Sequence, residues 1–143
     1  MSTILQINRS EVYQEVDKTT AYEGAHSGAF DNVHAKPQDK EMLERYWAEG
    51  IAFITDIIKK YAESITDDNT GYKAILSLPS NYDTRMTGPM NKAAYTYLCN
   101  YITAKWLEML SLEKASNYNA AATAQLAEMK SLFLHRVAPK RPE

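Results

Sequence analysis

The chain has 143 residues, of which 45% are apolar and 24% charged, and its formal net charge is −2. This length fits one domain with an ordinary core, and the composition excludes a disordered chain. The isoelectric point of about 5.9 argues against a dedicated nucleic-acid-binding domain, which needs a basic stripe. The single cysteine, Cys99, excludes an internal disulfide and favours a reduced cytoplasm. Its place in a helical pattern predicts a small buried residue.

Targeting signals are missing from the pattern, and charge is unevenly distributed. Residues 1–7 lack a charged region followed by a long apolar one, so we expect no signal peptide. No apolar run approaches the roughly 18 residues of a membrane span.

Residues 1–71 carry 13 acidic and 7 basic side chains, whereas residues 72–143 carry 5 acidic and 9 basic ones. Such a chain either folds back on itself, which we expect, or binds a second copy head to tail.

The first predicted helix runs from Asn8 to about Glu23. Asn8 can cap it, with Glu11 three residues later as in a capping box. Residues 24–38 have no hydrophobic period and contain two glycines and a proline, which predicts a flexible loop. A loop of this length is either functional or partly mobile.

The clearest pattern predicts a second helix that Asp39 caps and that continues to about Ile65. The apolar residues that recur every three to four positions are Leu43, Trp47, Gly50, Ile54, Ile57 and Tyr61. The stripe is broadened by Tyr46, Ile51, Phe53 and Ile58, so this helix should contact more than one neighbour. Gly50 costs about 1 kcal/mol against alanine in a helix, and a close crossing by another backbone would explain it. Residues 66–71 have the composition of a turn.

Residues 72–78 alternate between apolar and polar side chains, which predicts a short strand that ends before Pro79. A single strand leaves its backbone groups unpaired. Its partner is therefore residues 3–7, residues 81–86 or another subunit. The third possibility is of interest because strand addition is a common way to join proteins.

Two long helical patterns fill the rest of the chain. Thr87-Gly88-Pro89 opens the third helix, whose wide apolar surface is typical of a central helix in a bundle. The chain either restarts as a fourth helix near Ser111 or bends there, and the pattern continues to Arg136. Residues 136–143 form a basic tail that contains prolines. The expected fold is a single domain over residues 1–143, mainly α, with three to four helices in a bundle, a C-terminal helical hairpin and one short β segment near 72–78.

The sequence contains no recognisable catalytic, metal or cofactor motif. His26, Asp31 and His34 share the first loop, but their spacing matches no known zinc site. Residues 67–71 are similar to a calcium loop, yet the glycine falls one place early and Leu78 stands where the bidentate glutamate belongs. We therefore expect solvated histidines, a capped turn, no cofactor and no enzymatic activity.

The sequence is also rich in aromatic side chains, with ten tyrosines and two tryptophans. Tyr95, Tyr97 and Tyr101 occupy one predicted helix, and Trp106 follows about a turn later. Aromatic residues at helical spacing usually form core. The alternative is a protein–protein interface, in which tyrosine and tryptophan supply large contact areas.

One combination of short motifs resembles a known group. Leu78-Pro79-Ser80-Asn81-Tyr82-Asp83 precedes a helix with Tyr101-Ile102 and Lys105-Trp106-Leu107, followed by Ala115, Tyr118 and a closing Arg136 and Pro139-Lys140-Arg141-Pro142. Over residues 72–143 the chain resembles small uncharacterised proteins encoded among the virion-assembly genes of tailed phages and prophages. The resemblance implies a structural role as a neck, head-completion or tail-completion subunit that works in a ring. It brings no site residues with it.

We therefore expect a non-enzymatic structural or assembly protein that acts through protein–protein contacts, with itself or with other virion proteins. It would work in the cytoplasm during assembly and then in the virion. The residues expected to make the contacts are Tyr72, Leu76, Tyr82, Trp106, Arg136 and Arg141.

Three other hypotheses stay open at this point. The chain could be a small helical adaptor or regulatory protein that binds a host or phage partner. It could be a metal-dependent enzyme that uses His26, Asp31 and His34. The tail, with Arg136, Lys140 and Arg141, could also bind DNA weakly, with an affinity that falls steeply with salt.

Overall fold

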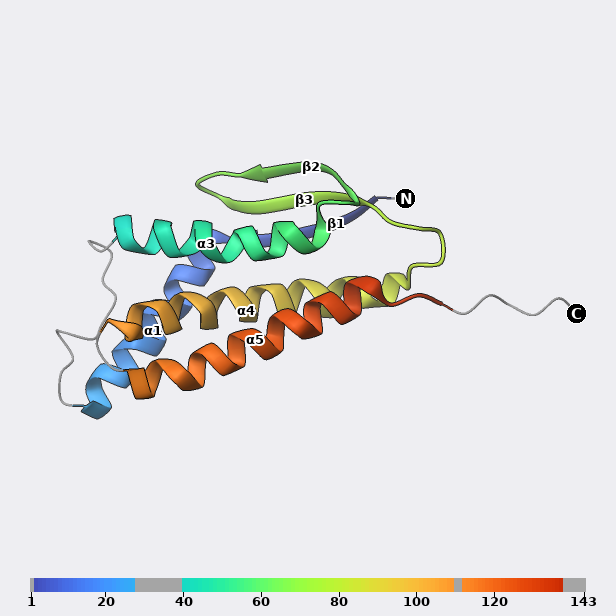
Figure 1. The fold of residues 1–143 in the computed structure, drawn as a ribbon. Coiled ribbons are helices and arrows are strands. Elements are labelled where there is room, and N and C mark those ends of the chain that lie inside the picture. Colours follow the sequence, from blue (N-terminus) through green and yellow to red (C-terminus); the bar gives the residue numbers. More distant parts are fainter. Residues whose placement is uncertain (1, 28–39, 110–111, 138–143) are drawn as a thin grey trace, which may run out of the picture.

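The computed structural model describes residues 2–27, 40–109 and 112–137 (Figure 1). The elements in chain order are β1 Ser2–Asn8, α1 Arg9–Ser27, α3 Lys40–Ile58, β2 Ala62–Asp67, β3 Gly71–Ser77, the short 3-10 helix η2 Thr84–Met86, α4 Thr87–Glu108 and α5 Leu112–Leu134. The predicted mainly helical class is confirmed. Across the described ranges, no helix is both long and apolar enough to cross a membrane.

The β structure is larger than the sequence indicated, because three strands form an antiparallel sheet in the order β1-β3-β2. The predicted strand at 72–78 is confirmed as β3, and the first of its three candidate partners is correct, since Leu5 lies opposite Ala74. On its other side β3 pairs with β2, where Ile65 lies opposite Ala74. The prediction of a helix up to Ile65 was wrong, because α3 ends at Ile58 and the chain turns into β2.

The turn between β2 and β3 depends on one aspartate and one glycine. The Asp68 carboxylate accepts hydrogen bonds from the backbone N–H groups of Thr70 (2.9 Å) and Gly71 (3.2 Å). Gly71 has φ of +151°, and a Cβ atom there would collide with the Ile7 carbonyl oxygen of β1. Glycine is therefore required where the hairpin passes β1. The turn composition predicted for residues 66–71 corresponds to this hairpin.

Helix α1 begins as expected and ends later than expected. The Asn8 side chain accepts a hydrogen bond from the Glu11 N–H (3.0 Å), which confirms the predicted cap. The helix continues to Ser27, so the prediction of a loop from residue 24 was wrong for 24–27. Near this end Glu23 accepts a hydrogen bond from the Tyr118 hydroxyl of α5 (2.8 Å), a tertiary contact that supports the last turns. The rest of the predicted loop, 28–38, lies outside the described residues.

Helix α4 is the central element and contacts α1, α3, α5 and β1. It begins at Thr87 with Pro89 in its first turn, as predicted. Because α4 ends at Glu108 and α5 begins at Leu112, the second half of the pattern is a separate helix, which lies alongside α4 (Figure 1). Cys99 is buried on α4, as expected.

Gly50 lies where α3 crosses α4. A Cβ atom at Gly50 would come within 2.5 Å of Leu98 Cδ1 and 3.1 Å of Tyr101 Cδ1. The predicted close approach is therefore confirmed, although the neighbouring atoms belong to side chains rather than to backbone. The core continues above this crossing into the inner face of the sheet, where Leu5, Ile7, Tyr72, Ala74 and Leu76 are buried.

Candidate interaction surface

The six residues expected to make contacts fall into different environments. Tyr72 and Leu76 face inward from β3 and are only 1% and 0% exposed. Tyr82 and Trp106 are also buried, and Arg136 is half-buried. Arg141 lies outside the described residues. In the single chain the buried four therefore pack within the protein, and a role in contacts with other proteins stays a prediction.

Tyr82 and Arg136 are the two members of this set that the fold brings together. They form an isolated antiparallel bridge, and the Val137 N–H donates to the Asn81 carbonyl oxygen (2.7 Å). The Arg136 guanidinium carbon lies 5.9 Å from the Tyr82 ring centre and 6.0 Å from that of Tyr61, within cation–π range. This contact ties the end of α5 to the segment between β3 and α4.

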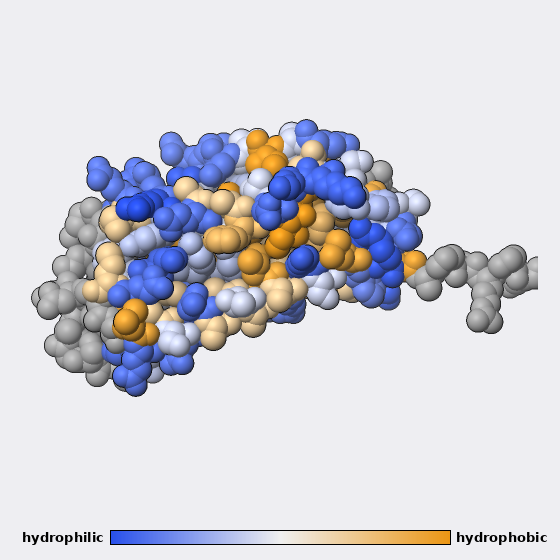
Figure 2. Space-filling model, in the orientation of Figure 1, coloured by the Kyte–Doolittle hydropathy of each residue, from blue (hydrophilic) through white to orange (hydrophobic). Residues whose placement is uncertain are grey.

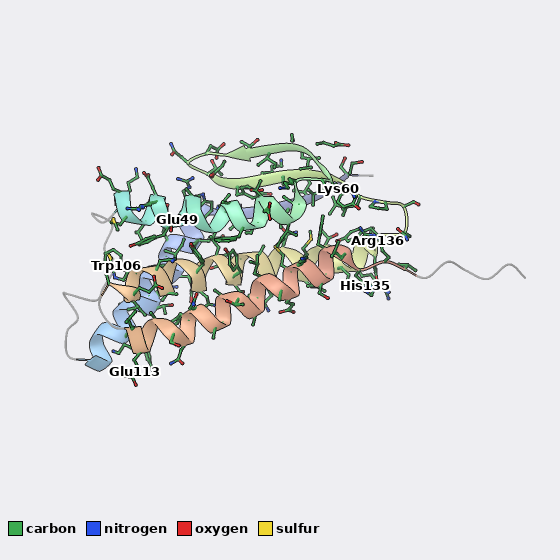
Figure 3. The ribbon with its side chains drawn as sticks, viewed as in Figure 1. Glu49, Lys60, Trp106, Glu113, His135 and Arg136 are labelled. Carbon is green, nitrogen blue, oxygen red and sulfur yellow. The ribbon has the colours of Figure 1, made fainter. Side chains whose placement is uncertain are left out.

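Arg136 also stabilises the end of its own helix. Its Nη1 donates to the carbonyl oxygens of Phe133 (2.9 Å) and His135 (3.0 Å). The last carbonyls of a helix have no partner within the helix, so a cation there is favourable. Lys60, His135 and Arg136 lie at this same end of the molecule (Figure 3). The arrangement gives Arg136 a structural role in the single chain.

Asp83 lies beside this contact and fixes the entry to α4. Its carboxylate accepts from the Arg85 backbone N–H (3.1 Å), from Arg85 Nε and Nη2 (both 2.9 Å), and lies 3.5 Å from His135 Nε2. The hydrogen bonds from Arg85 hold the pKa of Asp83 below its usual value. A carboxylate that is satisfied in this way orders η2 and has little capacity for proton transfer.

A groove lies between the first half of α3 and the end of α4, and we call it the α3–α4 groove. Its volume is about 310 Å³, and it is lined by Arg45, Tyr46, Glu49, Lys105, Glu108 and Met109. The Tyr46 hydroxyl donates to Met109 Sδ (3.4 Å) at its base. Figure 3 places Glu49 and Trp106 at this end of the molecule.

Opposite charges along the groove are already paired on their own helices. Arg45 Nε lies 3.5 Å from Glu49 Oε1 on α3, and Lys105 Nζ lies 3.5 Å from Glu108 Oε2 on α4. These are partly exposed pairs, which solvent screens and which contribute little to stability. They can exchange partners when another charged protein approaches.

An aromatic pair continues the groove toward the middle of α3. The rings of Phe53 and Tyr101 lie 6.0 Å apart, and the Tyr101 hydroxyl donates to Glu49 Oε2 (3.5 Å). Burial, aided by the nearby Glu49 carboxylate, raises the pKa of Tyr101 to about 12. Phe53 and Met109 are each 52% exposed. Figure 2 shows apolar side chains gathered over the middle of the molecule, whereas the end that carries Glu49 and Trp106 in Figure 3 is mostly polar on this face.

Two carboxylates line the groove. Glu49 and Glu108 each lie beside a cation and do not converge with a histidine or cysteine. Across the described ranges, no group of three metal-ligating side chains comes together. Of the hypothetical metal ligands, Asp31 and His34 lie outside the described residues, and His26 lies in the last turns of α1.

A smaller pocket of about 150 Å³ lies between α1 and α4, with polar residues such as Glu15, Asn100 and Thr103 in its wall. Cys99 also borders it, and burial raises the pKa of its thiol to about 12. A thiol with this pKa stays protonated at neutral pH and is a poor nucleophile.

Sequence reasoning did not single out the groove, because each of its residues has an ordinary explanation when taken alone. Tyr101 was interpreted as a core residue, and Glu49 and Arg45 are charged residues of the kind found on any exposed helix face. The useful signal was the breadth of the apolar stripe, which included Phe53. An apolar stripe that is wider than the neighbouring helix can cover leaves some of its side chains at the surface.

Comparisons with protein-family profiles, with curated proteins and with solved structures found no match. The resemblance of residues 72–143 to virion-assembly proteins therefore stays a prediction. The geometry of the surface is the main basis for assigning a function.

Proposed function

We propose that this chain is a non-enzymatic assembly protein that binds other protein subunits through the α3–α4 groove. The neck, head–tail connector and tail-completion proteins of tailed phages are the class that we favour, on the resemblance over residues 72–143. The partners are further copies of the chain or other virion proteins. The protein would act in the cytoplasm during assembly and afterwards in the virion.

The observation that carries the proposal is the exposure of large apolar side chains, Met109 in the groove with its paired charges and Phe53 beside it. Phe53 and Met109 leave about half of their surface in water, and Phe53 packs on Tyr101. Aromatic and methionine side chains are enriched at protein interfaces, where their burial supplies much of the affinity. The Arg45–Glu49 and Lys105–Glu108 pairs form a polar rim of the kind that surrounds such a centre.

The helices behind the groove supply a rigid support in this proposal. We take α4 and α5 as the predicted C-terminal helical hairpin of a bundle in which α3 covers α4. Helix α4 is held on several sides, so the groove keeps its shape when a partner binds. Preformed surfaces of this kind lose little entropy on association.

The proposal is tested with Phe53→Ser and, as a matched control, Ile4→Ser. Phe53 and Ile4 are both exposed apolar residues, at 52% and 43%, but Ile4 lies on β1 outside the groove. Light scattering over a concentration series and negative-stain imaging should show oligomers of the wild type and of Ile4→Ser. Phe53→Ser should stay folded and lose them.

Two outcomes would contradict the proposal. One is a wild-type protein that stays monomeric at high concentration and has no affinity for portal or tail components. The other is equal loss of assembly in both variants. Capture of one partner that is not part of a virion, with loss in Phe53→Ser alone, would instead favour the adaptor hypothesis.

A further inference from the structure

The methionines of the described ranges differ in how far solvent reaches their side chains. Met109 is 52% exposed, whereas Met90 and Met129 are fully buried in the core. Met42 and Met86 lie between these extremes, as half-buried residues. A peroxide oxidises the thioether of methionine to a sulfoxide, and an accessible sulfur reacts before a buried one. Among these five side chains, Met109 is therefore the one at which oxidation should begin.

The sulfur atom of Met109 is held at the base of the α3–α4 groove. The Tyr46 hydroxyl donates a hydrogen bond to Met109 Sδ (3.4 Å), and Tyr46 itself is buried. A thioether sulfur is a weak acceptor with two lone pairs, so one lone pair stays available. Arg45 and Lys105 line the same groove and are each paired with a glutamate of their own helix. The sulfur is thus accessible and has a fixed hydrogen-bond donor beside it.

We propose that Met109 is a reversible oxidation site that controls the binding of partners at the α3–α4 groove. The co-reactant is a peroxide. With hydrogen peroxide, a sulfur lone pair attacks one peroxide oxygen, the S–O bond forms and the O–O bond breaks. The sulfur loses two electrons, and the second oxygen leaves as water with both protons. A thiol-dependent sulfoxide reductase reverses the change, since two thiols become a disulfide and the sulfoxide oxygen leaves as water.

Oxidation replaces an apolar group of the groove by a polar one. The sulfoxide oxygen is a stronger acceptor than the sulfur, and the Tyr46 hydroxyl and water can donate to it in the free protein. An apolar side chain of a partner that packs on Met109 would exclude this water and leave the oxygen poorly paired, which is unfavourable. This inference rests on the proposed function and deepens it, because it states how binding at the groove is regulated.

Cys99 is the other sulfur-containing side chain that a peroxide could attack. It is buried, and burial raises the pKa of its thiol to about 12. Thiolates rather than thiols are the reactive form, so Cys99 should react slowly at neutral pH. Cys99 also borders the pocket between α1 and α4 and does not line the α3–α4 groove. Effects of peroxide on the groove should therefore come from Met109.

Tandem mass spectrometry of peptides from the folded protein, after mild treatment with hydrogen peroxide, tests the site. Met109 should be oxidised several times faster than Met90 and Met129, with Met42 and Met86 between them. Circular dichroism should show that the helices are kept. Equal rates at Met109 and Met90 in the folded protein would overturn the assignment of the site.

Two matched variants test the effect on binding. Met109→Leu keeps an apolar side chain of similar volume but has no sulfur, so its self-association should resist peroxide. Met42→Leu retains Met109 and should respond as the wild type does. In both of these proteins the dissociation constant, measured by sedimentation, should rise about tenfold on oxidation, which corresponds to about 1.4 kcal/mol. Methionine sulfoxide reductase with a thiol should restore the original value.

The outcomes separate this inference from the proposed function. Equal sensitivity of the wild type and of Met109→Leu to peroxide would overturn the role of Met109. Association that survives complete oxidation of Met109, although Phe53→Ser abolishes it, would overturn the regulation and leave the groove as the contact surface. A chain that binds no other subunit would remove the proposed function and the regulation together, and the peptide analysis would still decide whether Met109 is the oxidation site.

Discussion

Helices α3 and α4 meet in two different ways along their length. At Gly50 they approach so closely that the Tyr97 hydroxyl donates to the Gly50 carbonyl oxygen (3.0 Å) and Leu98 is fully buried. Toward Met109 the same helices separate into the α3–α4 groove, whose walls carry charged side chains. One pair of helices thus supplies a packed crossing and an accessible hollow.

The difference between these two regions depends on Gly50, which determines how closely side chains of α4 can approach α3. Because position 50 has no side chain, Leu98 and Tyr101 of α4 can lie against it. Arg45 and Glu49, which precede Gly50 on α3, carry long side chains that line the groove. We therefore expect the free energy of unfolding to depend on the crossing. The binding of other proteins should depend on the groove.

Alkaline pH should have the largest effect, because several buried hydroxyl groups respond together. Burial raises the pKa of Tyr101, which lies between the crossing and the groove, to about 12 and raises that of Tyr97 at the crossing further. The folded state therefore holds these protons more tightly than the unfolded chain, whose tyrosines titrate near 10. Stability should be complete below pH 10 and fall as the pH rises toward 12.

Tyrosinate absorbance and circular dichroism, followed together, check this prediction. Most of the absorbance change should accompany loss of helical signal, and Tyr97→Phe should reduce the dependence on pH more than Tyr101→Phe does. Complete ionisation of the tyrosines near pH 10 in a folded protein would contradict the assignment.

Gly50→Leu should have the next largest effect. The added side chain would overlap Leu98 and Tyr101, and overpacking of this kind costs about 3 kcal/mol. Ala52→Leu, at an exposed position of the same helix, is the matched control and should change the free energy of unfolding by less than about 0.5 kcal/mol. Urea denaturation measures both. Equal values for the two variants would show that the crossing is not tight.

Tyr97→Phe should have a smaller effect at neutral pH. It removes the hydrogen bond to the Gly50 carbonyl oxygen without changing the ring, and should lower the free energy of unfolding by about 1 kcal/mol. Tyr101→Phe loses only a long contact with Glu49 in the groove and should be nearly neutral. A larger loss of stability in Tyr101→Phe than in Tyr97→Phe, in thermal or urea unfolding, would contradict this expectation.

Glu49→Gln should have the smallest effect on stability, within about 0.5 kcal/mol, because its partners are partly exposed. The same change removes one charge from the rim of the groove, so association with a charged partner should change its rate and its salt dependence. Unfolding in urea and association at two salt concentrations measure the two effects. A large loss of stability would show that the rim belongs to the core.

Local signals predicted several parts of the fold. The Asn8 cap, Thr87-Gly88-Pro89 at the start of α4 and the alternation of β3 each depend on neighbouring residues, and each is confirmed. The close approach at Gly50 could also be anticipated, because glycine is costly inside a helix unless something needs the space.

Long-range contacts explain what the sequence did not reveal. Strand β2 was predicted as helix because Tyr61 and Ile65 continue the helical spacing, whereas its pairing with β3 decides its conformation. The hydrogen bond from the Gln6 N–H of β1 to the Asn91 side chain of α4 has no local signal. Tyr72 and Leu76 were chosen as contacts on the expectation that β3 could lack a partner, and pairing on both sides placed them in the core.

The pairing of β1 with β3 has a consequence for synthesis of the protein. Ser2 pairs with Ser77, so the first strand leaves the ribosome well before its partner strand is translated. Contacts between distant residues form slowly, and an unpaired strand is prone to aggregation during that interval. Strand β1 therefore stays without its partners until β3 and the turn of α4 that carries Asn91 have emerged.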